Sequence, residues 1–195
     1  MDLVIELWKQ SDPDANIIPI AIAQDSKYRF DFSPLDKLDP AQGTGFVVFD
    51  ERFGNVKRSE LMQAAIERGI KLTNFVSPRA FVPEGTKLGI NVFIADGVTL
   101  GTQCRVDYNS FIYPGTHIGN NVHIKPSCWI SRGVVIGDEV EIGRNCTIHT
   151  GASIANGVKV GNHCNLGWKK IYDKDIKDKT FFEPGYSEII QVFDN

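Results

Sequence analysis

Hydrophobic side chains recur at every sixth residue through the middle of the chain. The series begins at Val76, ends at Leu166 and contains only isoleucine, leucine and valine, with no insertion. Two residues before each member from Val82 onward lies a small or β-branched residue, from Ala80 to Cys164. Because strand side chains alternate between two faces, each such pair predicts a short strand with both of these residues pointing inward.

The other three residues of each hexad must turn the chain. Their last position favours glycine and asparagine, which tolerate a positive φ. This position is held by Gly85, Asn91, Gly97, Gln103, Asn109, Gly115, Asn121, Ser127, Gly133, Glu139, Asn145, Gly151 and Gly157. Three consecutive hexads, each with one strand and one turn, close one triangular coil. At a strand spacing of about 4.8 Å, the segment predicts roughly five coils of a parallel β-helix, about 25 Å tall.

The cysteines occupy the small inward position of this pattern. They are Cys104, Cys128, Cys146 and Cys164, and the last three follow one another at the spacing of one full coil. The pattern therefore favours buried thiols stacked inside the helix over a disulfide, a nucleophile or a zinc site.

The segment before the repeat has a different character. It predicts short buried strands at Ile17–Ala23 and Gly45–Phe49, a helix over Ser59–Arg68 and a strand at Lys71–Phe75. Ser59 is expected as the helix N-cap, and the glycine after Arg68 is expected to end the helix. This is a Rossmann-like alternation without a G-x-G motif, so either a nucleotide-cradling loop is absent or the first strand is missing.

The expected organisation thus has three segments. Residues 1–75 form a truncated Rossmann-like α/β unit, residues 76–170 form the β-helix, and residues 171–195 form a polar C-terminal extension.

The outward residue of each strand generates three columns, one per face of the helix. One column begins with four stacked aromatic residues, Phe75, Phe93, Phe111 and Trp129. An aromatic stripe that points outward must be covered by something. The cover is either the N-terminal unit or C-terminal extension, or identical copies packed as a three-fold ring, and we favour the ring. The second column is of mixed polarity, and the third is mostly charged.

Composition limits the classes of partner. The 195 residues carry a net charge of -3 and a pI near 5.8, which gives no electrostatic reason to expect nucleic acid or an anionic membrane as a partner. No apolar run approaches the ~20 residues of a membrane span. The first residues lack the basic flank and cleavage site of a signal peptide, so a cytoplasmic location is expected.

Repeats of the form Ile-Gly-x-x-Val, at Ile118–Val122 and Ile136–Val140, resemble those of left-handed β-helix acyltransferases. Together with the segments Asn55–Leu61, Asn74–Ala80 and Lys174–Ile176, the whole arrangement is similar to bacterial sialic acid O-acetyltransferases and bacillosamine N-acetyltransferases. The resemblance implies an all-β left-handed parallel β-helix that forms a homotrimer. It further implies acetyl-CoA in the groove between subunits, no metal, and an amino or hydroxyl group of a sugar or sugar nucleotide as acceptor, in a pathway of surface-polysaccharide type.

Some positions depart from the family pattern. Pro114 stands where the family has its catalytic histidine, and Asp107 stands where the family has a substrate-contacting asparagine. The second family histidine is matched by His123. The small Gly-Ala-Gly-Ala run near the last coil is replaced by Gly167-Trp168-Lys169-Lys170.

These matches lead to a set of candidate residues. His117 points outward three residues after Pro114 and is the candidate general base, since the attacking group must lose a proton. His123, Asp107 and Tyr113 are candidate substrate contacts. The candidate acetyl-CoA contacts are Gly133, Gly151, Trp168, Lys169 and Lys170. For each histidine taken singly, a structural or surface role outweighs a catalytic one, and the two lysines could cap the open end of the helix.

Two other classes remain open. A trimeric β-helix that has lost the transferase site would be a non-catalytic scaffold, which Pro114 and the altered Gly-Ala run favour. A zinc carbonic anhydrase of the same fold gathers three histidines between subunits, and no third histidine lies on the earlier coils here.

Overall fold

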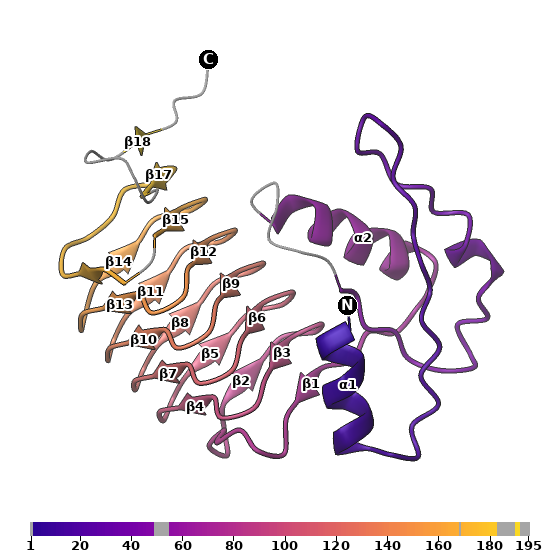
Figure 1. Cartoon of the computed structure of the whole chain (residues 1–195), viewed down its shortest axis with the longest axis horizontal. Helices are drawn as coiled ribbons and strands as arrows, with labels where there is room; N and C mark the ends of the chain where they lie inside the picture. The colour runs from indigo at the N-terminus through magenta and orange to yellow at the C-terminus, as the bar shows by residue number, and fades with distance from the viewer. Residues whose placement is uncertain (1, 49–54, 168, 183–189, 192–195) are drawn as a thin grey trace.

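The computed structural model describes residues 2–48, 55–167, 169–182 and 190–191 (Figure 1). Most of these residues form a parallel β-solenoid in which the chain passes through three sheets in turn. The first sheet contains β1 (Phe75–Val76), β3 (Phe93–Ile94), β6 (Phe111–Ile112), β9 (Trp129–Ile130), β12 (Thr147–Ile148), β15 (Asn165–Leu166), β17 (Thr180–Phe181) and β18 (Ile190–Gln191). The second contains β4 (Thr99–Leu100), β7 (His117–Ile118), β10 (Val135–Ile136), β13 (Ser153–Ile154) and β16 (Ile171–Tyr172). The third contains β2 (Lys87–Leu88), β5 (Arg105–Val106), β8 (His123–Ile124), β11 (Glu141–Ile142) and β14 (Lys159–Val160).

The register of the strands confirms the predicted repeat. Phe93 pairs with Phe111, and Arg105 pairs with His123, so each residue stacks on the one a full coil later. The inward isoleucines from Ile94 to Ile154 form the core and are at most 4% exposed. All thirteen predicted turn positions have a positive φ, between 55° and 87°. The turn chemistry therefore follows the sequence pattern through the whole solenoid.

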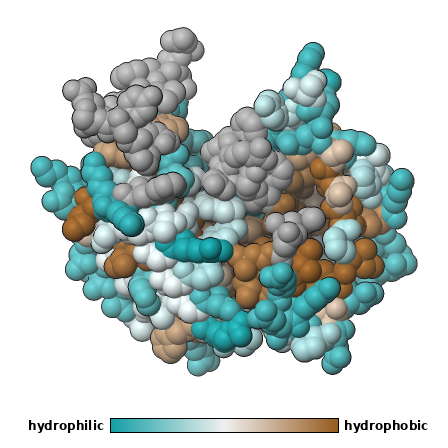
Figure 2. All heavy atoms as spheres, viewed as in Figure 1, coloured by the Kyte–Doolittle hydropathy of each residue, from teal (hydrophilic) through white to brown (hydrophobic). Residues whose placement is uncertain are grey.

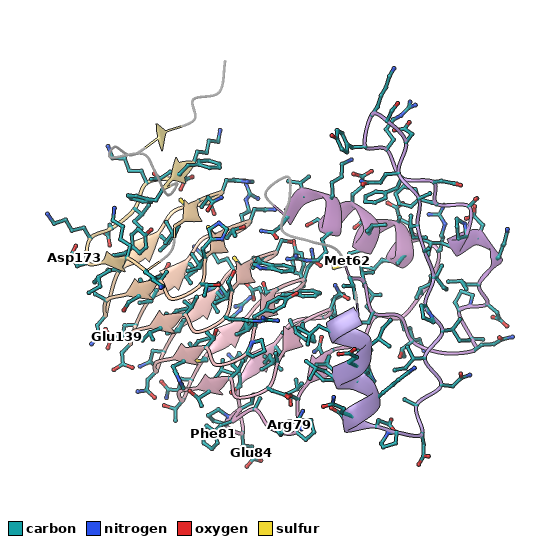
Figure 3. All side chains as sticks on the ribbon, in the orientation of Figure 1. Met62, Arg79, Phe81, Glu84, Glu139 and Asp173 are labelled. Carbon is teal, nitrogen blue, oxygen red and sulfur yellow. The ribbon has the colours of Figure 1, made fainter. Side chains whose placement is uncertain are left out.

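Residues 171–181 extend the solenoid by a further turn. β16 pairs with β13, Ile176 forms a bridge with Val160, and β17 pairs with β15. The beginning of the predicted polar extension is thus wound onto the last coil. Figure 3 orients the solenoid: Phe81 and Glu84 mark its first coil, Glu139 lies along one corner, and Asp173 marks its last coil.

The N-terminal segment differs from the expected α/β unit. It contains the helices α1 (Asp2–Ser11) and α2 (Val56–Glu67) and the short 3-10 helix η1 (Leu35–Lys37). In the described portion of this segment before β1, residues 17–23 and 45–48 form no strand, and the only pairings are the bridges Gln24↔Phe30 and Gly45↔Leu72. The predicted buried strands are therefore wrong, and a Rossmann-like unit is not confirmed; Phe49 lies outside the described residues. Ile18 is 71% exposed, because no strand or core residue of the described ranges covers this extended arm.

Helix α2 begins one turn earlier than predicted. Asn55, with φ of 62°, is its N-cap in place of Ser59. The Ser59 hydroxyl lies 2.8 Å from the Ser127 hydroxyl, so it joins the helix to a solenoid turn. The predicted C-terminus is confirmed, since Gly69 has φ of 76° and donates its N–H to Ile66 O at 2.9 Å.

The aromatic stripe is covered by the chain's own N-terminal segment. The Trp8 ring lies 5.2 Å from Phe75, and the Phe46 ring lies 5.6 Å from Phe111. The Arg58 guanidinium, on α2, lies 4.5 Å above the Phe111 ring. The expectation that identical copies cover this stripe is therefore wrong. Figure 1 shows α1 and α2 beside the first sheet, and in Figure 2 hydrophobic residues gather where these segments meet the solenoid.

Within the described ranges, no helix combines the length and the apolar character that crossing a bilayer requires.

Candidate functional site

A histidine and a carboxylate meet on the outer surface of the third sheet. His123 Nε2 lies 2.8 Å from Asp107 Oδ2, and Arg105 Nε lies 2.7 Å from Asp107 Oδ1. The repeat builds this arrangement, because Arg105 and His123 are stacked neighbours in the ladder and Asp107 follows Arg105 by two residues on the same face. The carboxylate therefore bridges a guanidinium and an imidazole.

The Asp107 carboxyl is held in its ionised form. Burial, with its side chain only 14% exposed, opposes ionisation, but the hydrogen bonds from His123 and Arg105 outweigh burial and lower the pKa of Asp107. An ionised carboxylate on Nε2 selects the tautomer that carries its proton there, so Nδ1 is the proton-accepting atom of the ring. A histidine oriented by a carboxylate is the usual arrangement of a general base.

His123 opens onto a hollow that spans the first coils of the third sheet. The hollow is lined by Gly85, Lys87, Gln103, Cys104, Arg105, Asn121, Val122 and His123. Its floor is made by inward residues, while its rim carries cationic and polar side chains. His123 thus lines a recess that is open to solvent.

His117, the predicted base, lies on a different face. It belongs to β7 of the second sheet and is exposed, and its Nδ1 lies 2.8 Å from the Thr99 hydroxyl. Its ladder neighbours are Thr99 and Val135, and among the described residues no carboxylate forms an ion pair with it. The structure therefore does not bring His117 and His123 together within one chain.

The other predicted contacts follow the corner between the first and second sheets. Tyr113 is half-buried, with its ring 4.6 Å from Trp129. Gly133 and Gly151 occupy the equivalent turn of two successive coils, with φ of 63° and 71°. Tyr113 thus extends the aromatic stripe, and the two glycines add no side chain at their own turn positions.

The last predicted contacts lie at the final coil. Lys169 is exposed, and Lys170 Nζ lies 4.3 Å from the centre of the Phe182 ring. Trp168 lies outside the described residues. The described candidate residues therefore divide into two groups. One group lies on the second sheet and at the corner between the first and second sheets, and it includes His117. The other group is Asp107 and His123 on the third sheet.

The four cysteines are buried and free, as predicted. Their thiols donate to backbone carbonyls of the next coil, for example Cys146 Sγ to Gly161 O at 3.0 Å. Burial raises the pKa of Cys146 well above its usual range. These thiols are structural, and among the described residues no three His, Cys, Asp or Glu side chains form a group able to hold a metal ion.

Sequence reasoning did not find two features. It named Asp107 and His123 as separate substrate contacts and did not pair them, although one coil separates Arg105 from His123. It also passed over Arg58, which is 0% exposed and donates to the backbone oxygens of Asn109 and Cys128 at 2.8 and 3.2 Å.

Comparison with known families and structures agrees with this architecture. Residues 123–156 match the family described as bacterial transferase hexapeptide (six repeats). The acetyltransferase domain of PglB from Neisseria gonorrhoeae is 17% identical with a TM-score of 0.82, covering 97% of this chain and 94% of its own. PerB from Caulobacter crescentus, solved in complex with CoA and GDP-perosamine, is 20% identical with a TM-score of 0.75, covering 92% and 82%. No curated protein matches the sequence.

The PglB domain has also been solved with acetyl coenzyme A, at 16% identity and a TM-score of 0.60, covering 97% of this chain and 93% of its own. At these identities the likeness shows the fold. The predicted resemblance to hexapeptide-repeat sugar acetyltransferases is thereby confirmed for the repeat and for the fold.

Proposed function

We propose that the protein is an acyltransferase that moves an acetyl group from acetyl-CoA to an amino or hydroxyl group of a sugar or sugar nucleotide. The repeat, the fold and the similarity to solved sugar acetyltransferases support this class of reaction. The Asp107–His123 pair is the observation that carries the proposal, because it supplies the base that acyl transfer requires.

In the proposed reaction, the acceptor nitrogen or oxygen attacks the thioester carbonyl of acetyl-CoA. A C–N or C–O bond forms, the C–S bond breaks, and the thiolate of CoA leaves. His123 Nδ1 takes the proton of the acceptor and returns it to the departing sulfur, so no other reactant is needed. Asp107 holds the ring and stabilises the imidazolium that forms in between.

This assignment moves the base from His117 to His123. Imidazole becomes cationic during the transfer, and only a negative partner stabilises that charge strongly. His123 has the Asp107 carboxylate, whereas the described partner of His117 is the neutral Thr99 hydroxyl. His117 then becomes a contact for substrate.

The division of the predicted residues supports a homotrimer of left-handed β-helices. Asp107 and His123 lie on the third sheet, whereas Gly133, Gly151 and Lys169 lie toward the opposite corner of the same solenoid. Because the two groups lie on different sides of one solenoid, a site that used both would span a boundary between two copies. We therefore place acetyl-CoA in a groove between subunits, with the base from one copy and the glycine corner from its neighbour.

The rival function is a non-catalytic scaffold. It is favoured by Pro114 at the family's histidine position and by Lys170, which lies over the Phe182 ring near the expected path of CoA. Calorimetric titration with acetyl-CoA, beside sedimentation analysis, separates the two. We expect a trimer that binds acetyl-CoA at micromolar concentration and releases CoA thiol when amino sugars or their nucleotide forms are added. A trimer that neither binds acetyl-CoA nor releases thiol would be the scaffold.

A further inference from the structure

The hollow beside His123 is basic on a chain that is acidic overall. Lys87, on the edge strand β2, is exposed, and no described carboxylate forms an ion pair with it. Arg105 stands next to it in the ladder with its side chain 56% exposed. The chain as a whole carries a net charge of -3, so this positive surface is local.

Nearby carboxylates do not neutralise Lys87. Asp107 is shared by Arg105 and His123, and Glu141 lies 3.7 Å from Lys125. Glu84, in the turn before β2, projects outward from the first coil (Figure 3). The Lys87 ammonium is thus available to a ligand in the hollow.

Two backbone donors add to this site. In later coils the turn residue donates its N–H to the preceding coil, as Asn121 does to Thr102 O and Glu139 does to Asn120 O. Gly85 and Gln103 hold the same turn position and line the hollow, but their N–H groups have no hydrogen-bond acceptor among the described residues. Turns with alternating αR and αL residues are a known backbone cradle for anions.

We propose that Lys87, Arg105 and the N–H groups of Gly85 and Gln103 form an anion subsite that holds a phosphate or carboxylate group of a substrate next to His123. Two side-chain cations and two backbone donors suit the several oxygens of such a group. The proposal rests on the proposed function for the identity of the substrate, although anion binding itself can be measured without turnover. The anion belongs either to the sugar acceptor or to the phosphates of CoA.

The first test is calorimetric titration with inorganic pyrophosphate. We compare the wild-type protein with Lys87→Ala and with the control Lys159→Ala, which removes an exposed lysine from the same column at the far end of the third sheet. Lys87→Ala should weaken pyrophosphate binding about tenfold, and Lys159→Ala should change it less than about twofold. Matching melting temperatures confirm that both variants fold. No binding to the wild type, or equal binding to Lys87→Ala, would overturn the subsite.

The second test identifies which substrate brings the anion. If the acceptor does, Lys87→Ala raises KM for anionic acceptors but not for their neutral analogues, and binding of acetyl-CoA is unchanged. If the donor does, acetyl-CoA itself binds about tenfold more weakly to Lys87→Ala. Pyrophosphate binding that depends on Lys87, with no effect on either substrate, would overturn the link to a substrate. A wild-type protein that binds pyrophosphate through Lys87 but transfers no acetyl group would reject the proposed function and leave the subsite in place.

Discussion

Asp107 Oδ2 lies 2.8 Å from His123 Nε2 although the two residues belong to successive coils of the solenoid. Two features hold this contact in place. Arg105 Nε lies 2.7 Å from the other carboxylate oxygen of Asp107, and the strands that carry Arg105 and His123 are paired. The carboxylate therefore acts on His123 as an orienting and charge-stabilising partner.

Asp107→Asn removes this charge while keeping the size of the side chain. An amide cannot stabilise the imidazolium as a carboxylate does, so we expect kcat/KM for acetyl transfer to fall about ten- to hundredfold. The measurement is CoA thiol release at saturating acetyl-CoA.

Asp138→Asn is the matched control for this change. The Asp138 carboxylate accepts the N–H of Asn120, and the Asn156 side chain, at the next coil, accepts the N–H of Asp138 in the same manner. An asparagine therefore already fills this role in the solenoid, and transfer by the variant should equal that of the wild type. An equal loss of kcat/KM in both variants would show that Asp107 contributes only to the stability of the fold and does not assist His123.

Arg58 joins the N-terminal segment to the solenoid. Its guanidinium lies over Phe111 at 4.5 Å and over Trp129 at 5.4 Å. Arg58→Ala leaves buried carbonyls without a donor and opens a cavity, so we expect the free energy of unfolding to fall by about 3 kcal/mol. Urea unfolding followed by tryptophan fluorescence measures the loss.

Arg132→Ala provides the comparison, because Arg132 is exposed in a solenoid turn. Its loss should change the stability by less than about 0.5 kcal/mol. If Arg58→Ala lowered the free energy of unfolding as little as Arg132→Ala, the packing of the N-terminal segment on the solenoid would not depend on the Arg58 contacts.

Gly143 lies where two coils approach closely. A Cβ built there would lie 2.4 Å from Gly161 O and 2.5 Å from Gly161 C, which are backbone atoms that cannot move aside alone. Gly143→Ala should therefore destabilise the protein by about 2 kcal/mol or more, measured as a shift of the urea midpoint. Gly43→Ala meets no atom within 4 Å and should leave the midpoint unchanged.

The solenoid could be predicted because its sequence signal is redundant. The hydrophobic period, the small inward residues and the positive-φ turns each specify the same coil, so an atypical turn residue such as Glu139, with φ of 59°, does not disturb it. The N-terminal segment has no such redundancy. Ile17–Ala23 has the composition of a strand, but a strand also needs a partner, and a local pattern does not reveal whether the chain supplies one.

The candidate site was only partly predictable. The repeat fixes which faces carry His117 and His123, and both lie on the predicted faces. The contact between Asp107 and His123 depends on how each side chain leaves the strand, which the spacing does not specify. The role of Arg58 could not be predicted for another reason. An arginine on a helix is usually exposed to solvent, and only the fold shows that this one faces the aromatic stripe.

The central claim, that His123 is the general base of an acetyl transfer, is tested most directly by comparing His123→Ala with His117→Ala in the same assay. The quantity to measure is kcat for acetyl transfer from acetyl-CoA to an amino sugar, with binding of acetyl-CoA measured in parallel. We predict that His123→Ala lowers kcat about 10²-fold or more and that His117→Ala changes it only a few-fold. A loss of about 10²-fold in His117→Ala, with little change in His123→Ala, would contradict the account.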